Sequence, residues 1–260
     1  MTIGSGAGGR FESYVLCTSP RSGSTLLCSL LAATGLAGNP KSFFHEPSVA
    51  NWSAHLLTPP GRRGSDLDYA RTVVDAAIAE GTNSTGVFGL RLQRHSFDFL
   101  LGKLALLHPE QMSDADRFRA AFGRTLFIHL TRADKIAQAV SCVIAQQTGL
   151  WHMAPDGTAL ERVKEHQDPV YDGPALRRTY DETVELDRQW LSWFASEAIE
   201  PLRLSYDRLS VDPLSVLREV LRALRLDEGA ADGVAIGVKK LANGTNRDWA
   251  RRLRAELDTA

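Results

Sequence analysis

The chain has 260 residues, and its 30 lysines and arginines against 31 aspartates and glutamates give a net charge of −1 at pH 7. This balance excludes the broad basic surface that binds nucleic acid or an anionic membrane, so a positive site has to be local. The length suits one domain, which we expect over residues 1–260 with a flexible, glycine-rich lead over 1–12. The sequence contains no apolar run of about 18 residues, so we expect no integral membrane segment.

Apolar runs and helical patterns alternate along the chain. The predicted strands cover residues 14–18, 87–92, 126–130 and 202–205. The predicted helices cover residues 24–33, 69–80, 96–107, 134–147, 175–196 and 213–224. Ser96 and the pair Asp212-Pro213 are expected to begin two of these helices, while residues 51–68 and 151–173 are expected to form loops. Strands separated by helices need crossover connections, which predicts an α/β three-layer sandwich with a central parallel sheet.

The turn between the first strand and the first helix is rich in hydroxyl groups and reads Ser19-Pro-Arg-Ser-Gly-Ser-Thr25. At the start of a helix the backbone N–H groups are unpaired, and the helix dipole favours an anion there. Arg21 adds a cation to the same turn. The sequence therefore predicts a phosphate-binding loop. The residues expected to form it are Arg21, Ser22, Gly23, Ser24 and Thr25.

This loop differs from that of nucleoside triphosphatases, which place a lysine before the last hydroxyl residue and bind magnesium. No lysine precedes Ser24 or Thr25, and the strand 126–130 is followed by Thr131-Arg132 instead of an acidic metal ligand. The pattern favours a less charged group and no metal, as in a phosphosulfate donor. A metal-dependent nucleotide or small-molecule kinase on a degenerate loop, or a non-catalytic nucleotide-binding module, are the alternatives.

The stretch Arg21-Ser-Gly-Ser-Thr-Leu-Leu27, together with Ala33-Thr-Gly-Leu-Ala-Gly-Asn-Pro40, resembles carbohydrate sulfotransferases, and among them the bacterial trehalose 2-sulfotransferase family. The resemblance implies that 3′-phosphoadenosine-5′-phosphosulfate (PAPS) is the sulfuryl donor. It also implies a hydroxyl group of a carbohydrate or glycolipid as the acceptor, and it makes a homodimer plausible. Arg21 would contact the transferring end of the donor.

Two later segments also resemble this family. The stretch 132–141 is similar to its Arg-Pro-Asp-x-x-x-Gln-Ala-Val-Ser, and the resemblance implies that Arg132 and Ser141 bind the 3′-phosphate. The stretch 245–252 resembles a segment that closes over the nucleotide, which implies contacts from Arg247 and Trp249. From the residues alone, Arg132 could instead pair with a surface carboxylate beside a helix-capping Asp134, and Trp249 could belong to the core.

The acceptor hydroxyl must lose a proton, so a general base is expected in the segment after the first helix. The resembling family carries a glutamate before Phe-Phe, whereas this chain has Ser42 before Phe43-Phe44, and serine cannot accept a proton at neutral pH. We expect His45 to be the base, because histidine titrates near neutral pH, with Glu46 as the alternative. The departure at Ser42 leaves it open whether trehalose is the acceptor.

Other polar side chains have weaker assignments. Arg91 and Arg94 follow a predicted strand and are expected either to bind the acceptor or to form a solvated helix start. His129 alternates with apolar residues and is expected to pack in the sheet. His55 and Glu80 are the next candidates if neither His45 nor Glu46 is the base.

Three cysteines, Cys17, Cys28 and Cys142, lie in apolar segments and lack metal-ligand spacing. We expect them to be packed as free thiols, which suits a reducing compartment. The first ten residues also lack the apolar core of a signal peptide. The sequence therefore favours a cytoplasmic protein without a metal.

Overall fold

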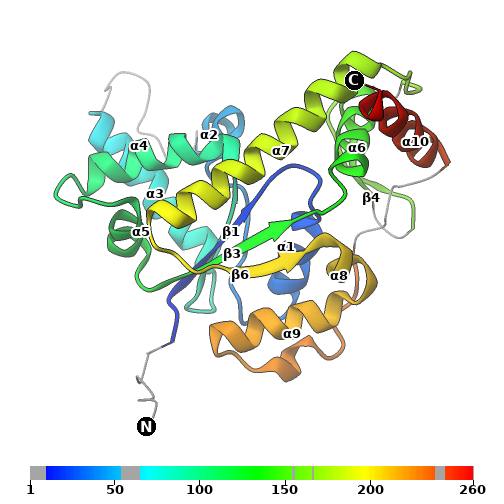
Figure 1. The fold of residues 1–260 in the computed structure, drawn as a ribbon. Coiled ribbons are helices and arrows are strands. Elements are labelled where there is room, and N and C mark those ends of the chain that lie inside the picture. Colours follow the sequence, from blue (N-terminus) through cyan, green and yellow to red (C-terminus); the bar gives the residue numbers. More distant parts are fainter. Residues whose placement is uncertain (1–9, 54–64, 154–155, 166, 238–243, 260) are drawn as a thin grey trace, which may run out of the picture.

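A computed structural model describes residues 10–53, 65–153, 156–165, 167–237 and 244–259. Its centre is a parallel sheet with the strand order β2-β1-β3-β6 (Figure 1). The strands are β1 Ser13–Thr18, β2 Phe88–Gln93, β3 Thr125–Thr131 and β6 Leu202–Ser205. Each predicted strand is confirmed, with ends that differ by at most one residue. Helices cover both faces of the sheet, so the predicted α/β sandwich is also confirmed (Figure 1).

The helices include all six that the sequence predicts. They are α1 Ser24–Ala33, α2 Glu46–Ser53, α3 Asp66–Thr82, α4 Phe97–Leu107, α5 Asp114–Phe122, α6 Lys135–Thr148, α7 Gly173–Ser196, α8 Tyr206–Val211, α9 Pro213–Leu224 and α10 Gly244–Asp258, with short 3-10 turns at Arg94–Ser96 and Glu228–Ala231. None of the helices in the described ranges is long and apolar enough to cross a membrane.

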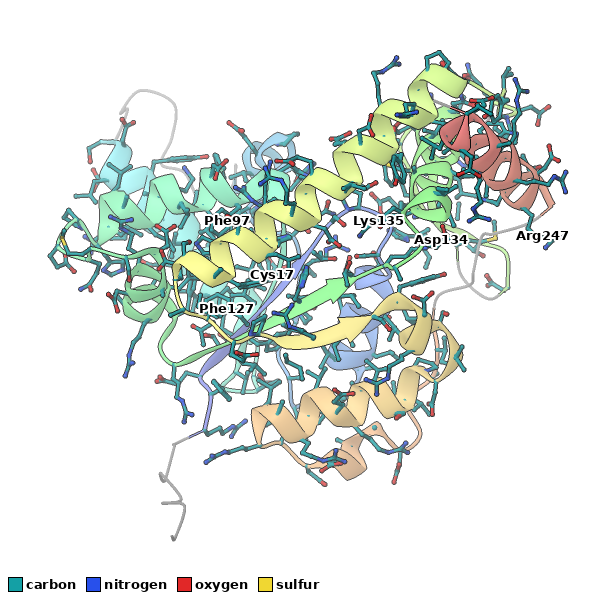
Figure 2. The ribbon with its side chains drawn as sticks, viewed as in Figure 1. Cys17, Phe97, Phe127, Asp134, Lys135 and Arg247 are labelled. Atoms are coloured by element: carbon teal, nitrogen blue, oxygen red, sulfur yellow. The ribbon has the colours of Figure 1, made fainter. Side chains whose placement is uncertain are left out.

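Strand β1 is buried along its whole length, because its alternating side chains enter two different cores. Val15 and Cys17 face a core built with α3, α4, α5 and α7, whereas Tyr14 and Leu16 face one built with α1 and α9. Figure 2 shows Cys17 with Phe97 and Phe127 in the first of these layers. The three cysteines are free and buried, as predicted.

The register of the sheet aligns the carboxyl ends of its central strands. Thr18, the last residue of β1, pairs with Gln93 on β2 and with Leu130 on β3. In a parallel sheet the segments that leave these ends meet at one edge, which is where open α/β proteins bind ligands. The loop after β1, the segment after β2 and the segment around Arg132 after β3 therefore meet there.

Several local predictions need correction. The segment 151–173, predicted as a loop, contains most of an antiparallel pair, β4 Leu150–Met153 and β5 Ala159–Arg162. The helices α2 and α3 extend into the predicted loop 51–68 from both sides. Ser96 stands at the N-cap of α4, but its side chain forms no cap bond, because its backbone is helical and a capping residue is usually extended. Asp212 does cap α9, by accepting from the Ser215 N–H at 3.0 Å.

The expected lead over residues 1–12 is shorter than predicted. Residues 1–9 lie outside the described part, but Phe11 packs against the second core, and its ring lies 4.5 Å from the Arg124 guanidinium. The Glu12 N–H donates to the Arg124 carbonyl at 2.9 Å. These contacts make residues 11 and 12 part of the fold.

Candidate active site

The loop after β1 presents the start of α1 to a cavity. Gly23, at the N-cap of α1, has a φ of 88°, and no side chain caps the helix there. A Cβ on Gly23 would lie 2.7 Å from Tyr206 Cδ2, so both the backbone conformation and the space require glycine. The N–H groups at this helix start are thus left for an anion.

Buried hydrogen bonds hold this loop in place. The fully buried Ser22 hydroxyl bonds with Thr18 Oγ1 and donates to the Ser19 carbonyl at 2.9 Å. Gln138 Nε2 on α6 donates to the Pro20 carbonyl at 2.7 Å and to Ser19 Oγ at 3.0 Å. The side chain of Ser22 therefore supports the loop and does not line the cavity.

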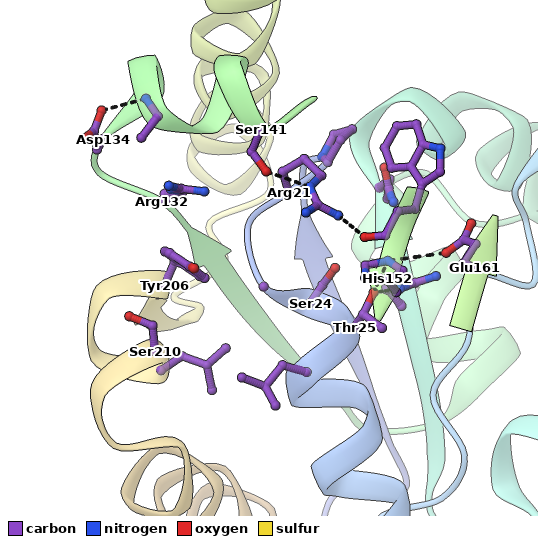
Figure 3. A pocket seen from close by; sticks show the side chains of 18 of the residues that line it. Arg21, Ser24, Thr25, Arg132, Asp134, Ser141, His152, Glu161, Tyr206 and Ser210 are labelled. Carbon is purple, nitrogen blue, oxygen red and sulfur yellow. Dashed lines mark hydrogen bonds and ion pairs between the residues drawn. The ribbon is translucent and has the colours of Figure 1, made fainter. Parts of the chain in front are cut away.

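Arg21 has neutral partners only. Its Nε donates to Ser141 Oγ at 3.0 Å and its Nη1 donates to the Trp151 carbonyl (Figure 3). Burial lowers the pKa of Arg21, and Arg132 nearby lowers it further. No carboxylate of the described residues lies within ion-pair distance of this guanidinium. The sequence placed Arg21 and Ser141 in two separate anion sites, but their hydrogen bond makes these sites adjacent.

Arg132 is a second partly buried cation at this site. Its guanidinium carbon lies 4.5 Å from the centre of the Tyr206 ring, and burial lowers its pKa. Among the described residues no carboxylate is close enough to form an ion pair with it. Asp134 caps α6 by accepting from the Ala137 N–H at 2.8 Å (Figure 3). The structure thus contains the cap that the sequence left open, but not the surface ion pair.

A cavity of about 1090 Å³ joins these groups. The predicted site residues that line it are Arg21, Gly23, Ser24, Thr25, His45, Arg91, Arg132, Ser141 and Arg247. They come from the loop after β1, the start of α1, the segment before α2, the strand β2, the segment after β3 and the helices α6 and α10. Residues far apart in sequence therefore share one site.

Besides Ser22, three predicted residues do not line this cavity. Trp249 is buried on the other side of α10, where its ring meets Tyr171 edge to face at 5.5 Å. Glu46 is exposed at the start of α2. Arg94 pairs with Asp98 at 3.3 Å and lies over the Phe97 ring. Trp249 therefore packs in the core, Glu46 faces solvent and Arg94 forms an ion pair. His55, another candidate base, lies outside the described residues.

Arg91 lines another part of the cavity. Its Nε donates to Ser42 Oγ at 2.7 Å and its Nη1 donates to Thr25 Oγ1 at 2.8 Å. His45 Nδ1 lies 2.9 Å from Ser48 Oγ, and the His45 ring meets the His95 ring edge to face at 5.8 Å. Burial, and to a lesser degree His45, lower the pKa of His95. Two imidazoles therefore face the cavity beside Arg91.

His152 on β4 is a site residue that the sequence interpretation missed. Its Nε2 lies 3.0 Å from Thr25 Oγ1 and 3.3 Å from Glu161 Oε2 on β5 (Figure 3). Burial, then Arg21 and Arg91, lower the pKa of His152 to about 4. One feature of the sequence indicates this hairpin: the pair Asp156-Gly157 lies between His152 and Glu161, and Asp-Gly is typical of a hairpin turn.

The lowered pKa of His152 predicts a pH dependence of stability. The unfolded chain binds a proton on this ring below about pH 6.5, whereas the folded protein does so only near pH 4. The stability given by the neutral ring is therefore complete above pH 6.5 and is lost as the pH falls toward 4. We expect the free energy of unfolding to fall more steeply in the parent than in His152→Gln, by at most about 1.4 kcal/mol per pH unit. Urea titrations between these pH values measure it, and parallel curves would contradict it.

The sequence also predicts that His129 packs in the sheet. His129 is 3% exposed within the sheet, with Nε2 3.6 Å from Asp187 Oδ1, which confirms that it packs there. Asp187 also pairs with Lys135 on α6 at 2.5 Å. Within the described ranges no group of three His, Cys, Asp or Glu side chains is arranged to hold a metal.

The chain is similar to known sulfotransferases over most of its length. A family model described as Stf0 sulphotransferase matches residues 13–256. The chain is 29% identical to a trehalose 2-sulfotransferase of Mycobacterium tuberculosis and 29% identical to one of Mycolicibacterium smegmatis, each over 94% of both chains. Among solved structures, it is similar to a sulfotransferase domain of the Synechococcus PCC 7002 olefin synthase, with a TM-score of 0.43, 14% identity and 98% of both chains covered. It is also similar to a sulfotransferase from Alicyclobacillus acidocaldarius, with a TM-score of 0.42, 13% identity and coverage of 96% of this chain and 94% of that one.

Proposed function

Because the chain belongs to the Stf0 sulphotransferase family, we propose that it transfers a sulfuryl group from PAPS to a hydroxyl group of a carbohydrate. One observation carries the choice of donor: Arg21 and Arg132 are both partly buried, have no carboxylate partner among the described residues and face the same cavity. A buried charge is costly unless it is paired, so such a site favours a ligand with two separate anionic groups. PAPS has these, in its phosphosulfate and its 3′-phosphate.

The order of residues along the cavity gives PAPS a direction. Arg132, Tyr206 and Ser210 lie on one side of the α1 start, and Thr25 with His152 lies on the other (Figure 3). In the proposed arrangement the 3′-phosphate binds beside Arg132, with Ser141 and Arg247 near it. The phosphosulfate then lies at the α1 start between Arg21 and Thr25, and its sulfuryl end faces Arg91 and His45.

In the proposed reaction the acceptor oxygen forms a bond to sulfur, and the bond between sulfur and the bridging oxygen breaks. The electron pair of that bond stays on the 5′-phosphate of the leaving adenosine 3′,5′-bisphosphate. Arg21 and the N–H groups of Ser24 and Thr25 stabilise this charge. No step requires a metal.

His45 receives the acceptor proton in this proposal. The single hydrogen of Ser48 Oγ is donated to the His45 carbonyl at 2.9 Å, so this oxygen accepts from His45 Nδ1. A neutral imidazole with its hydrogen on Nδ1 has a free electron pair on Nε2. Ser48 therefore supports the tautomer that a general base needs.

We propose a carbohydrate as the acceptor without assigning one particular sugar. Both similar curated proteins are named for trehalose, which we include among the candidate acceptors together with glycolipids. Ser42 accepts a hydrogen bond from Arg91 and cannot be a base, so a group other than the one at this position has to take the acceptor proton. The family does not favour the kinase alternative. We also propose a cytoplasmic location, which the three free, buried cysteines support.

Donor recognition gives the first test. We expect adenosine 3′,5′-bisphosphate to bind about 10- to 150-fold more tightly than AMP, because AMP leaves Arg132 unpaired. Arg132→Ala should abolish this preference, whereas Arg208→Ala, which removes an exposed arginine paired with Glu219, should keep it. Isothermal titration calorimetry measures both affinities. Equal affinity of the parent for the two nucleotides would contradict PAPS as donor.

Turnover separates the enzyme from a binding module. Radiolabelled PAPS is incubated with trehalose, other sugars and glycolipids, and transfer of the label is followed by chromatography. Label on at least one hydroxyl acceptor is the expected result. Tight binding of the bisphosphate without transfer to any acceptor would favour the non-catalytic module, and a preference for ATP with magnesium would favour the kinase.

A further inference from the structure

Thr25 has an unusual set of hydrogen-bond partners for a hydroxyl at a helix start. Arg91 Nη1 lies 2.8 Å from its Oγ1, and a guanidinium can only donate, so the oxygen accepts this bond. His152 Nε2 lies 3.0 Å from the same oxygen. The hydrogen on the His152 ring decides the direction of the second bond.

Glu161 favours a hydrogen on His152 Nε2. Its Oε2 lies 3.3 Å from this nitrogen, and a carboxylate oxygen can only accept. If Nε2 carried an electron pair instead, it would face that oxygen without a hydrogen between them. The ring is only 21% exposed and lies near Arg21 and Arg91, two cations that oppose a second proton on it. Neutral His152 with its hydrogen on Nε2 therefore donates to Thr25.

These two bonds fix the direction of the Thr25 hydroxyl. An Oγ atom has two electron pairs, and Arg91 and His152 occupy both. The hydrogen of Thr25 must then point elsewhere. Thr25 lines the cavity, and among the described residues its hydroxyl oxygen bonds to Arg91 Nη1 and His152 Nε2, which both donate, and to no acceptor.

We infer that His152 is a positioning residue for sulfuryl transfer: together with Arg91 it turns the Thr25 hydroxyl hydrogen toward the phosphosulfate group of the donor. This inference rests on the proposed function. His152 keeps its own proton throughout, and the bonds that form and break are those given above. The hairpin β4–β5 thus belongs to the donor site, since Trp151 also accepts from Arg21.

A double-mutant cycle tests whether His152 acts through Thr25. Thr25→Val keeps the side-chain shape but removes the hydroxyl, and we expect it to lower kcat/KM for PAPS by about tenfold, the value of one hydrogen bond. His152→Ala should cost nearly as much. The double variant should be no slower than Thr25→Val alone, because both changes remove the same interaction. Losses that multiply in the double variant would overturn the inference.

Two further variants separate positioning from packing. His152→Gln places an amide N–H near the position of Nε2 and should recover at least half of the parent kcat/KM, whereas the shorter His152→Asn should not. Leu160→Ala removes an exposed side chain of β5 and is the control for the hairpin. Equal activity of the Gln and Asn variants would contradict a role for the Nε2 hydrogen.

A spectroscopic measurement keeps this test separate from the proposed function. Heteronuclear NMR of the imidazole nitrogens identifies the His152 tautomer in the parent protein, with His152→Gln used to assign the signal. A hydrogen on Nε2 is expected, and a hydrogen on Nδ1 would overturn the inference whatever the activity. If the parent transferred no sulfuryl group to any acceptor, the proposed function would fail while the hydrogen-bond arrangement could still be decided.

Discussion

Replacing Arg21 with alanine is expected to lower turnover by about 30- to 1000-fold while leaving the fold intact. In the proposed reaction, charge develops on the leaving phosphate at the α1 start, near this guanidinium. A charge-assisted contact there is expected to contribute about 2 to 4 kcal/mol in the transition state. Stability should not fall, because Arg21 is a partly buried cation without a carboxylate partner among the described residues. Initial rates with PAPS and urea unfolding measure the two effects.

Two variants control this result. Arg225 has the same left-handed backbone conformation, with a φ of 59° against 61° for Arg21, but it is exposed at the end of α9. Arg225→Ala should therefore keep full activity. Arg21→Lys retains the charge but not the planar fork that reaches both Ser141 and Trp151, so it should recover activity only in part. Near-parent turnover in a folded Arg21→Ala protein would refute the proposed role of the loop.

The sheet was predictable because a strand that is buried on both faces consists mostly of apolar residues, and such a run is visible in the sequence. A central strand such as β1 has helices on both sides, so its residues form a continuous apolar run. The hydroxyl-rich turn follows this strand directly, so it must lie at the carboxyl edge of the sheet. Arg132 could be placed at the same edge because it directly follows another such run.

The hairpin was not predictable in the same way. All four residues of β5 are exposed, and β4 is a partly buried strand of only four residues, so neither strand forms a long apolar run. Its contacts with Arg21 and Thr25 join residues more than 120 positions apart. Such contacts depend on how the elements pack, and a single sequence gives no direct sign of them.

Helical spacing would have corrected the prediction for Trp249. Arg247, Arg251 and Arg254 recur on one face of α10 and line the cavity. Trp249 and Leu253 are four residues apart on another face and are buried against α6 and α7. An aromatic residue paired in this way with an apolar one belongs to the core.

His45→Ala is expected to lower kcat by about 100-fold or more, with little change in the affinity for adenosine 3′,5′-bisphosphate. In the proposed mechanism the Ser48 hydroxyl fixes the His45 imidazole so that its Nε2 can take the proton of the acceptor hydroxyl. If His45 is removed, Ser42 offers no carboxylate that could take this proton instead. Steady-state rates at saturating PAPS and acceptor measure the loss. The rate of the parent should also fall on acidification, because a protonated imidazole cannot accept a proton, and the alanine variant should lose this part of the profile.

Matched variants decide between His45 and its neighbours. Glu46→Gln should keep nearly full activity, because Glu46 is exposed and does not line the cavity. His108→Ala should do the same, because it removes a histidine at the C-terminal end of α4 that does not line the cavity either. Ser48→Ala should cost less than His45→Ala, since the imidazole remains but is no longer held in one tautomer. If Glu46→Gln were inactive while His45→Ala retained most of its activity, the base would be the carboxylate, and α2 would have to turn in the complex to bring it to the acceptor.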